Sequence, residues 1–241
     1  MRPDVLRGRA CVVTAATGGI GSSIARELAG RGCRLLLTSR SPDRLAALQQ
    51  ELALQGGGAC VAHHAADLRD PGAVARLAEE AERVLGPCDV LVNCAGAFLS
   101  RPFAECGVAD FDDIFALNVR APMLLSQALV PGMAARGWGR VVNIGSSSAY
   151  AGFAGSALYC ASKHALLGLS RALHAEYRER GVRVYCISPG SVRTAMGRQV
   201  PGQDFESFIE PAEVAEYVAF ALSFDGALVS EEIRLNRMVM R

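Results

Sequence analysis

The first apolar run of the chain leads into a glycine-rich stretch, Thr14-Ala15-Ala16-Thr17-Gly18-Gly19-Ile20-Gly21, and residues 19–31 then have the pattern of a helix. Glycines at a strand-to-helix turn let the backbone approach a pyrophosphate, and the amides and positive dipole of the helix end can bind it. A turn that is rich in glycine only for packing is the alternative. The stretch therefore predicts a nucleotide-binding unit at the start of the chain.

Short apolar runs alternate with longer helical patterns along the rest of the chain. The runs are continuous, which is typical of strands buried on both faces of a parallel sheet. The predicted strands are 10–14, 33–38, 59–63, 89–92, 140–145, 182–187 and 232–236, and the predicted helices are 19–31, 42–55, 71–85, 111–135, 156–180 and 211–224. This order predicts an α/β fold with a doubly wound, seven-stranded parallel sheet and helices on both faces, the Rossmann fold. We expect a single domain over residues 1–241, with a short lid at about 195–210.

Composition narrows the class of protein. The chain has 241 residues, of which 51% are hydrophobic, and 25 Lys and Arg against 24 Asp and Glu give a net charge of +1. This apolar fraction excludes a disordered chain, and the charge balance argues against nucleic-acid binding. The eight cysteines form no CxxC pair, which favours a reducing compartment. We expect a cytoplasmic protein without a membrane span.

Three potential metal ligands lie close together, Cys60, His63 and His64. On a strand, alternate side chains point to opposite faces, so His63 points away from the other two. No fourth ligand is near in the sequence, and we expect no metal site.

The second predicted strand ends in Thr38-Ser39-Arg40. NAD-preferring proteins usually carry an acid at this strand end, which binds the ribose hydroxyls. A guanidinium instead suits a 2′-phosphate, because it can pair with two oxygens at once. Arg40 therefore favours NADP(H), with a solvated arginine at the start of a loop as the alternative.

Further motifs follow the later strands in a fixed order. They are Asp67-Leu68, Asn93-Cys94-Ala95-Gly96, Asn118, Ser146, Tyr159-Cys160-Ala161-Ser162-Lys163, Pro189-Gly190 and Thr194. Together with Thr14 to Gly21, which matches the pattern TGxxxGxG, they resemble the short-chain dehydrogenase/reductase family, in its compact single-domain branch, over nearly the whole chain. Two positions depart from the family pattern, since Ala15 replaces its first glycine and Cys94 replaces the second Asn of NNAG. Ala15 must either avoid a positive φ or accept some strain.

The resemblance implies a set of cofactor contacts. They are Thr14, Ala16, Thr17, Gly19, Ile20, Gly21, Ser39, Arg40, Asp67, Leu68, Asn93, Ala95, Gly96, Tyr159, Lys163, Pro189, Gly190, Val192 and Thr194. Within this set, the pair Asp67 and Leu68 would contact the adenine, and Thr194 would contact the nicotinamide carboxamide.

The chemistry would centre on Tyr159 and Lys163, which are four residues apart and so share one face of a helix. A phenol ionises poorly near neutral pH, and a nearby ammonium favours its ionised form. Tyr159 then suits general acid/base catalysis. Ser146 would hydrogen-bond the substrate oxygen. By resemblance, Asn118 would hold a water that relays protons to Lys163.

The resemblance thus implies an oxidoreductase that transfers a hydride between NADP(H) and a carbonyl or secondary alcohol. Two alternatives stay open. The first is a 3-oxoacyl-carrier-protein reductase of the same family, whose acidic partner could meet a set of basic side chains. That set is Arg136, Arg140, Arg178 and Arg180. The second is a non-catalytic protein that binds and senses NADP.

Apolar residues fall on the loops that are expected around the cleft. They are Phe98, Ala149, Phe153, Leu158, Met196, Phe205 and Phe208. They predict an apolar pocket for a small carbonyl or alcohol substrate. The predicted helices 111–135 and 156–180 are apolar on more than one side, so each needs cover beyond its own sheet. Family members pair these helices across a two-fold axis, and we expect a homodimer or homotetramer.

Overall fold

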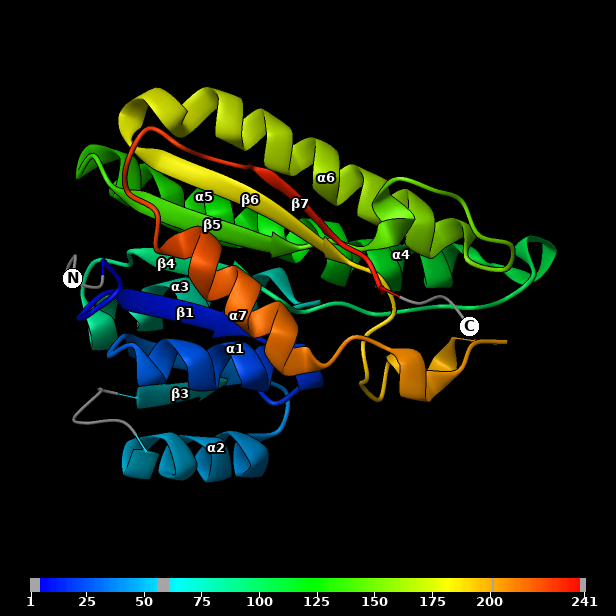
Figure 1. Cartoon of the computed structure of the whole chain (residues 1–241), viewed down its shortest axis with the longest axis horizontal. Helices are drawn as coiled ribbons and strands as arrows, with labels where there is room; N and C mark the ends of the chain where they lie inside the picture. The colour runs from blue at the N-terminus through cyan, green and yellow to red at the C-terminus, as the bar shows by residue number, and fades with distance from the viewer. Residues whose placement is uncertain (1–4, 56–60, 201, 239–241) are drawn as a thin grey trace.

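A computed structural model of the chain describes residues 5–55, 61–200 and 202–238. Seven parallel strands form one sheet in the order β3-β2-β1-β4-β5-β6-β7 (Figure 1). Their bounds are Ala10–Thr14 (β1), Arg34–Ser39 (β2), Val61–Ala65 (β3), Val90–Asn93 (β4), Gly139–Ile144 (β5), Val182–Pro189 (β6) and Glu232–Leu235 (β7). The predicted fold class is confirmed.

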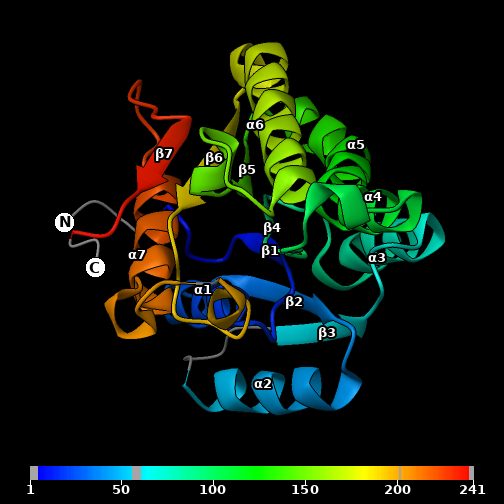
Figure 2. The same cartoon turned by 90° about the vertical axis from the view of Figure 1, so that its right-hand side faces the viewer.

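Helices cover both faces of the sheet. Their bounds are Gly19–Gly30 (α1), Pro42–Gln55 (α2), Pro71–Leu85 (α3), Val108–Phe115 (α4), Ala121–Ala135 (α5), Ala157–Tyr177 (α6) and Pro211–Leu222 (α7). Figure 2 shows α1, α2 and α7 on one face and α3 to α6 on the other. Two apolar clusters fill the space between the sheet and these layers, one under each group of helices. Burial of both strand faces explains why the strands read as continuous apolar runs.

Local signals fix several helix starts where the sequence predicts them. The Asp70 carboxylate accepts bonds from the Gly72 and Ala73 amides and so caps α3, whose first residue is Pro71. Such a cap satisfies amides that have no acceptor within the helix. At α7, the Glu213 carboxylate accepts from the Glu210 amide in the same way. The helix bounds at these ends therefore follow from sequence.

The predicted helix 111–135 is wrong in two respects. The helix starts earlier, at Val108, and a π-helical turn over Ala116–Arg120 separates α4 from α5. Pro122 has no N–H, so it cannot donate the usual helical bond to the carbonyl of Asn118, four residues before it. The wider turn places the Asn118 side chain inside the molecule, where it is fully buried.

The run Val108–Ala135 has 28 residues, and its most apolar window has a mean hydropathy of 1.3, long and apolar enough by composition to cross a membrane. Half of that window is buried inside the fold, where α4 packs on α6 and α5 packs on α3. In this structure the run is a core helix.

The order of the strands reverses between β1 and β4, which are neighbours although β2 and β3 separate them in sequence. Ligands of such sheets bind at this point, beyond the carboxyl ends of the strands. Thr14, the last residue of β1, ties the two strands together there. Its hydroxyl donates to the Val92 carbonyl and accepts from the Cys94 and Ala95 amides, at 2.9–3.2 Å.

Candidate active site

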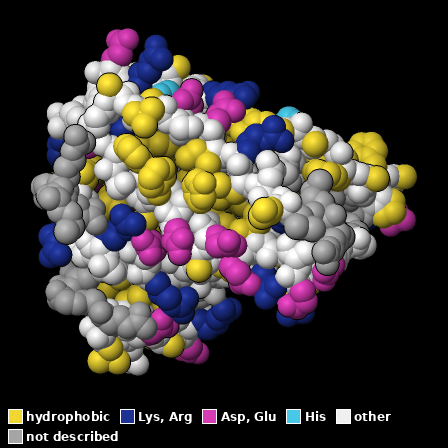
Figure 3. All heavy atoms as spheres, viewed as in Figure 1, with side chains coloured by type: hydrophobic (Ala, Val, Ile, Leu, Met, Phe, Trp, Pro, Cys, Tyr) yellow, Lys and Arg dark blue, Asp and Glu magenta, His cyan; other side chains and the backbone are white. Residues whose placement is uncertain are grey.

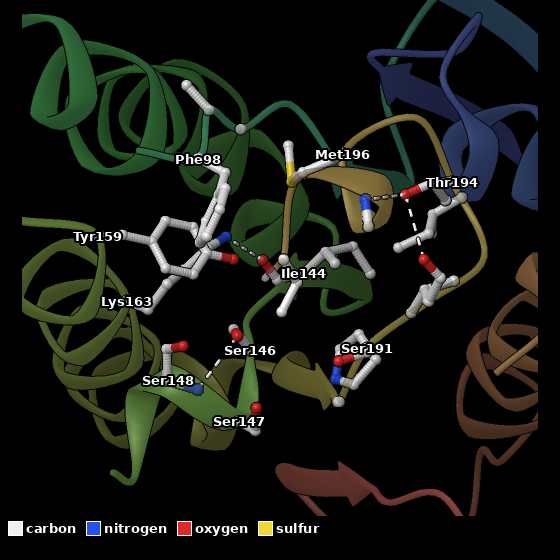
Figure 4. Close-up of a pocket in the computed structure, with 18 of the residues that line it drawn as sticks. Phe98, Ile144, Ser146, Ser147, Ser148, Tyr159, Lys163, Ser191, Thr194 and Met196 are labelled. Carbon is white, nitrogen blue, oxygen red and sulfur yellow. Dashed lines mark hydrogen bonds between the residues drawn. The ribbon is translucent and has the colours of Figure 1, made fainter. Parts of the chain in front are cut away.

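A cavity of about 510 Å³ opens at the carboxyl ends of β1, β4, β5 and β6. The glycine-rich turn lines one end, and Tyr159 and Lys163 line the other, with Ser146 between them at the end of β5 (Figure 4). Residues from four strand ends and from α6 thus meet in one space, as the order of the motifs predicts.

The glycine-rich turn packs so closely against Ala15 and Thr194 that Gly21 and Gly19 have no space for a side chain. A Cβ on Gly21 would lie 2.2 Å from the Ala15 carbonyl oxygen, and one on Gly19 would lie 2.4 Å from a methyl carbon of Thr194. No side chain caps α1, so its first amides remain available to a phosphate. This cradle fits the pyrophosphate of a dinucleotide.

Ala15 has a φ of +50°, the one positive φ of a non-glycine residue in the part of the chain that the structure describes. The chain thus accepts strain at the position where the family pattern has glycine. The Cβ of a left-handed residue crowds its own backbone, which costs about 1–2 kcal/mol.

Several predicted cofactor contacts do not line the cavity but support its walls. Thr14 holds the loop after β4, the Ala16 amide donates to the Thr38 carbonyl, and Asn93 donates to the Asn143 side chain at 2.8 Å. Ala95 belongs to the loop that Thr14 holds. In this structure these residues bond to the loops and strands that form the cavity wall and do not line the cavity themselves.

The predicted adenine and ribose contacts lie outside the cavity as well. Arg40 is exposed and Ser39 half-buried at the end of β2. Leu68 is buried, while the Asp67 carboxylate accepts from the Arg69 amide at 3.0 Å. Sequence reasoning missed Arg44, which donates to the Thr17 carbonyl at 2.6 Å and so places a second guanidinium beside the glycine-rich turn.

Tyr159 and Lys163 lie one helical turn apart near the start of α6. The Lys163 ammonium donates to the Ile144 carbonyl at 2.9 Å and lies 5.7 Å from the centre of the Tyr159 ring. The rings of Phe98 and Tyr159 pack in a T-shape, with their centres 4.9 Å apart and their planes at 82°. These contacts hold the ring of Tyr159 in place while it faces the cavity (Figure 4).

Ser146 follows β5 and is 9% exposed. Its hydroxyl oxygen accepts from the Ser148 amide at 3.1 Å, which leaves its proton for another acceptor. The short helical turn Ser147–Ala149 begins here, so the hydroxyl is held at a fixed point on the cavity wall. A substrate oxygen between Ser146 and Tyr159 could contact both hydroxyls.

The Asn118 side chain does not line the cavity, and its polar atoms bind protein. Its carbonyl accepts from the Ala97 amide at 2.8 Å, and its amide donates to the Ala97 carbonyl and to Ser162, each at 3.0 Å. Asn118 therefore fastens the loop after β4 to α6. The water relay implied by the resemblance stays a prediction.

Of the remaining cofactor contacts from the sequence, Thr17 does not line the cavity, whereas the others do, namely Ile20, Gly96, Pro189, Gly190, Val192 and Thr194. The apolar loop residues divide. Phe98, Phe153 and Met196 line the cavity, whereas the described cavity wall does not include Ala149, Leu158, Phe205 or Phe208. Phe205 and Phe208 pack on each other, with ring centres 5.3 Å apart. Cys94, which the sequence singled out only as a departure from the family pattern, lines the cavity as well. Sequence reasoning missed Ser100, Ser148 and Ser156, whose only signal was their place after a strand end or beside a helix start.

The arginines that favoured a carrier-protein partner do not lie at the cavity. Arg136 and Arg140 lie at the start of β5, and Arg178 and Arg180 precede β6. All four are therefore at the amino ends of the parallel strands, whereas the cavity is at the carboxyl ends. Arg140 is 1% exposed and pairs with Asp225 at 2.6 Å. Arg140 is therefore not available to an acidic partner, and the other three are exposed away from the cavity, while the carrier-protein hypothesis itself stays a prediction.

No group of three His, Cys, Asp or Glu could hold a metal within the described ranges, and Cys60 lies outside them. His63 instead shares a hydrogen bond of 2.7 Å with Gln49.

Comparison with known proteins places the chain. The model of the short chain dehydrogenase family matches residues 9–204. Acetoacetyl-CoA reductase of Allochromatium vinosum is 32% identical over 88% of this chain and 90% of its own. 1-Deoxy-11-beta-hydroxypentalenate dehydrogenase of Streptomyces exfoliatus is 37% identical over 91% and 82%.

Solved structures agree with these relatives. A metagenomic short-chain oxidoreductase in complex with NADP is 36% identical, with a TM-score of 0.86 over 97% of this chain and 99% of that one. An alcohol dehydrogenase of the archaeon Thermococcus sibiricus, complexed with 5-hydroxy-NADP, is 28% identical, with a TM-score of 0.89 over 98% and 99%. With its motifs in family order and its cavity at the strand ends, the chain belongs to the short chain dehydrogenase family.

Proposed function

We propose that the protein is an NADP(H)-dependent oxidoreductase that transfers a hydride between nicotinamide and a carbonyl or secondary alcohol. The observation that carries the proposal is the single cavity that Tyr159, Lys163 and Ser146 share with the glycine-rich turn. A nucleotide-binding protein without catalysis has no need for an acid/base pair beside its ligand. The family, whose members include reductases and dehydrogenases, supports the same reaction class.

NADP(H) is the proposed cofactor because two guanidiniums lie near the predicted ribose site. Arg40 is exposed at the end of β2, and Arg44 is bound to the turn itself. Both could pair with a 2′-phosphate. The solved relative with 36% identity binds NADP, which supports this choice. The individual cofactor contacts stay proposals, as does a cytoplasmic location.

In the proposed mechanism the nicotinamide, when bound, supplies the hydride to the carbonyl carbon. Ser146 donates a hydrogen bond to the carbonyl oxygen and fixes its position. Tyr159 donates a proton to the same oxygen as negative charge develops on it. Lys163, whose ammonium is held by the Ile144 carbonyl, keeps a positive charge beside the Tyr159 ring while the proton leaves. Oxidation of an alcohol runs through the same contacts in reverse.

The Tyr159→Phe variant tests this proposal. It removes one hydroxyl and keeps the ring that packs on Phe98, so we expect NADPH to bind as before, by fluorescence titration. We expect kcat to fall at least 100-fold across a panel of ketones, as loss of a general acid requires. Tyr150→Phe is the matched control, because Tyr150 lies on a neighbouring loop but outside the cavity. Undiminished ketone reduction by Tyr159→Phe would overturn the mechanism.

The same assay decides the alternatives. A sensor protein would bind NADPH and oxidise none with any ketone. The hypothesis of a 3-oxoacyl-carrier-protein reductase loses the support of the basic side chains, because Arg140 is buried and the other three arginines lie at the amino ends of the strands.

A further inference from the structure

We infer that the substrate of the proposed reductase is an uncharged, largely apolar carbonyl compound, and that the cavity rejects carboxylates. This inference rests on the proposed function and names its substrate class. It is carried by the charges of the side chains in and around the cavity.

The part of the cavity beyond the proposed cofactor contacts is apolar with a few hydroxyls. Phe98, Phe153, Ala154, Met196 and Val200 supply its carbon surface. Ser100, Ser148 and Ser156 supply the hydroxyls. Lys163 is the one Lys, Arg, Asp or Glu among the described residues that line the whole cavity. The substrate tail therefore meets no side-chain charge of its own.

The charge of Lys163 is committed elsewhere. Its ammonium donates to the Ile144 carbonyl, lies beside the Tyr159 ring, and belongs to a residue that is 5% exposed. A carboxylate that reached Lys163 would occupy the place of the reacting carbonyl. Lys163 thus cannot anchor the tail of a substrate whose carbonyl lies against Tyr159.

Two of the arginines that adjoin cavity residues in the sequence have acidic partners outside the cavity, and a third, Arg198, lies over the Phe205 ring at 4.0 Å from its centre. Arg193 pairs with Glu210 at 2.9 Å and with Glu206 at 3.3 Å. Arg101 pairs with Asp110 at 2.7 Å. None of the three residues Arg101, Arg193 and Arg237 lines the cavity.

Arg237 comes nearest through another residue. It donates to the Gln203 side chain at 2.9 Å and to Ser207 at 3.0 Å. Gln203 does line the cavity, but its carbonyl oxygen is already bonded to Arg237 and Ser191. An anion would have to break these contacts to gain a cation.

A carboxylate in this space would lose its hydration without a counter-charge, which is costly for any buried ion. A neutral group of the same shape avoids most of that cost. We therefore expect kcat/KM to differ at least 100-fold between a neutral ketone and its carboxylate analogue of equal size.

The test compares 4-acetylbenzamide with 4-acetylbenzoate at pH 7.5, by oxidation of NADPH. The two ketones have almost the same shape and differ in one charge. A kcat/KM at least 100-fold higher for the amide supports the inference. Equal values, or a preference for the acid, overturn it and leave the proposed function intact. If neither these nor any ketone of the panel is reduced while NADPH binds, the proposed function fails, and the inference falls with it.

A second test adds a positive charge to the cavity wall by substitution. Met196 lines the cavity at its edge and is 36% exposed, so a lysine there can reach inward while its chain stays partly solvated (Figure 4). We expect Met196→Lys to raise kcat/KM for 4-acetylbenzoate relative to the amide at least tenfold. Met196→Gln, of similar length but neutral, should leave the ratio unchanged. If Met196→Lys also leaves it unchanged, charge does not set the selectivity and the inference is wrong.

Discussion

At the scale of single residues, the strained Ala15 gives a direct test of the turn. With φ at +50°, its Cβ crowds the backbone, and glycine would relieve this. We expect Ala15→Gly to raise the free energy of unfolding by about 1 kcal/mol, measured by urea denaturation. Ala16→Gly is the matched control. Ala16 is fully buried without a positive φ, so its loss should lower stability instead. A free energy of unfolding that falls in Ala15→Gly, as it does in Ala16→Gly, would show that Ala15 is not strained.

Cys88 makes stability depend on alkaline pH. Burial, and after it the charge of Asp89, raises the pKa of its thiol from the ordinary value of 9.0 to about 12. Between these values the unfolded chain loses the thiol proton while the folded chain keeps it. Stability from this group is therefore complete below pH 9 and falls by about 1.4 kcal/mol per pH unit above it.

The Cys88→Ala variant isolates that contribution, because other groups also titrate above pH 9. We expect its free energy of unfolding, measured by urea denaturation from pH 8 to 11, to fall less steeply than that of the wild-type protein. The difference in slope should approach 1.4 kcal/mol per pH unit. Parallel curves would mean that Cys88 ionises equally in both states.

At the scale of elements, the predicted bounds of most strands and helices agree with the structure to within a few residues. Buried runs bounded by Gly, Pro and Asp carry their own limits, as the Asp70 cap of α3 illustrates. Pro122 marks a break in the helical bonding near Asn118, but the sequence does not predict a π-helical turn there or the inward direction of the Asn118 side chain. That direction depends on bonds to Ala97 and Ser162, which are distant in sequence. The prediction that Phe205 and Phe208 line the cavity was wrong for the same reason, because the direction of a loop side chain depends on distant residues. These two rings pack on each other instead.

The segment at about 195–210 is the element we expect to act as the substrate lid. Arg193 holds its far end through Glu206 and Glu210. We expect Arg193→Ala to loosen the segment and to raise KM for a ketone three- to tenfold, with little change in kcat. Arg171→Ala breaks an ion pair with Glu232 away from the cavity and is the control. A KM equal to that of wild type, in steady-state assays, would argue against a lid at 195–210.

At the scale of the whole molecule, two separate faces expose apolar side chains. Figure 3 shows hydrophobic side chains gathered over α7, on which Tyr217 and Phe220 are 50% and 55% exposed, and Leu228, in the segment after α7, is 66% exposed. A small groove of about 230 Å³ lies between α5 and α6, and Met123 and Leu173 line it. Apolar patches of this kind mark interaction surfaces. The sequence predicted only the face of α5 and α6. The apolar face of α7 could not be predicted, because the sequence does not show which side of that helix is exposed.

If each of the two faces pairs with its own copy on another chain, the result is a tetramer with three two-fold axes. We therefore expect the wild-type protein to be a homotetramer by light scattering. Phe220→Glu buries a charge in one interface and Met123→Glu in the other, so each variant should stop at a dimer and the double variant at a monomer. Leu54→Glu is the control, because Leu54 is 89% exposed on α2, away from both faces. A tetramer that survives both charges, or a wild-type protein that is already monomeric, would mean that neither face joins the subunits.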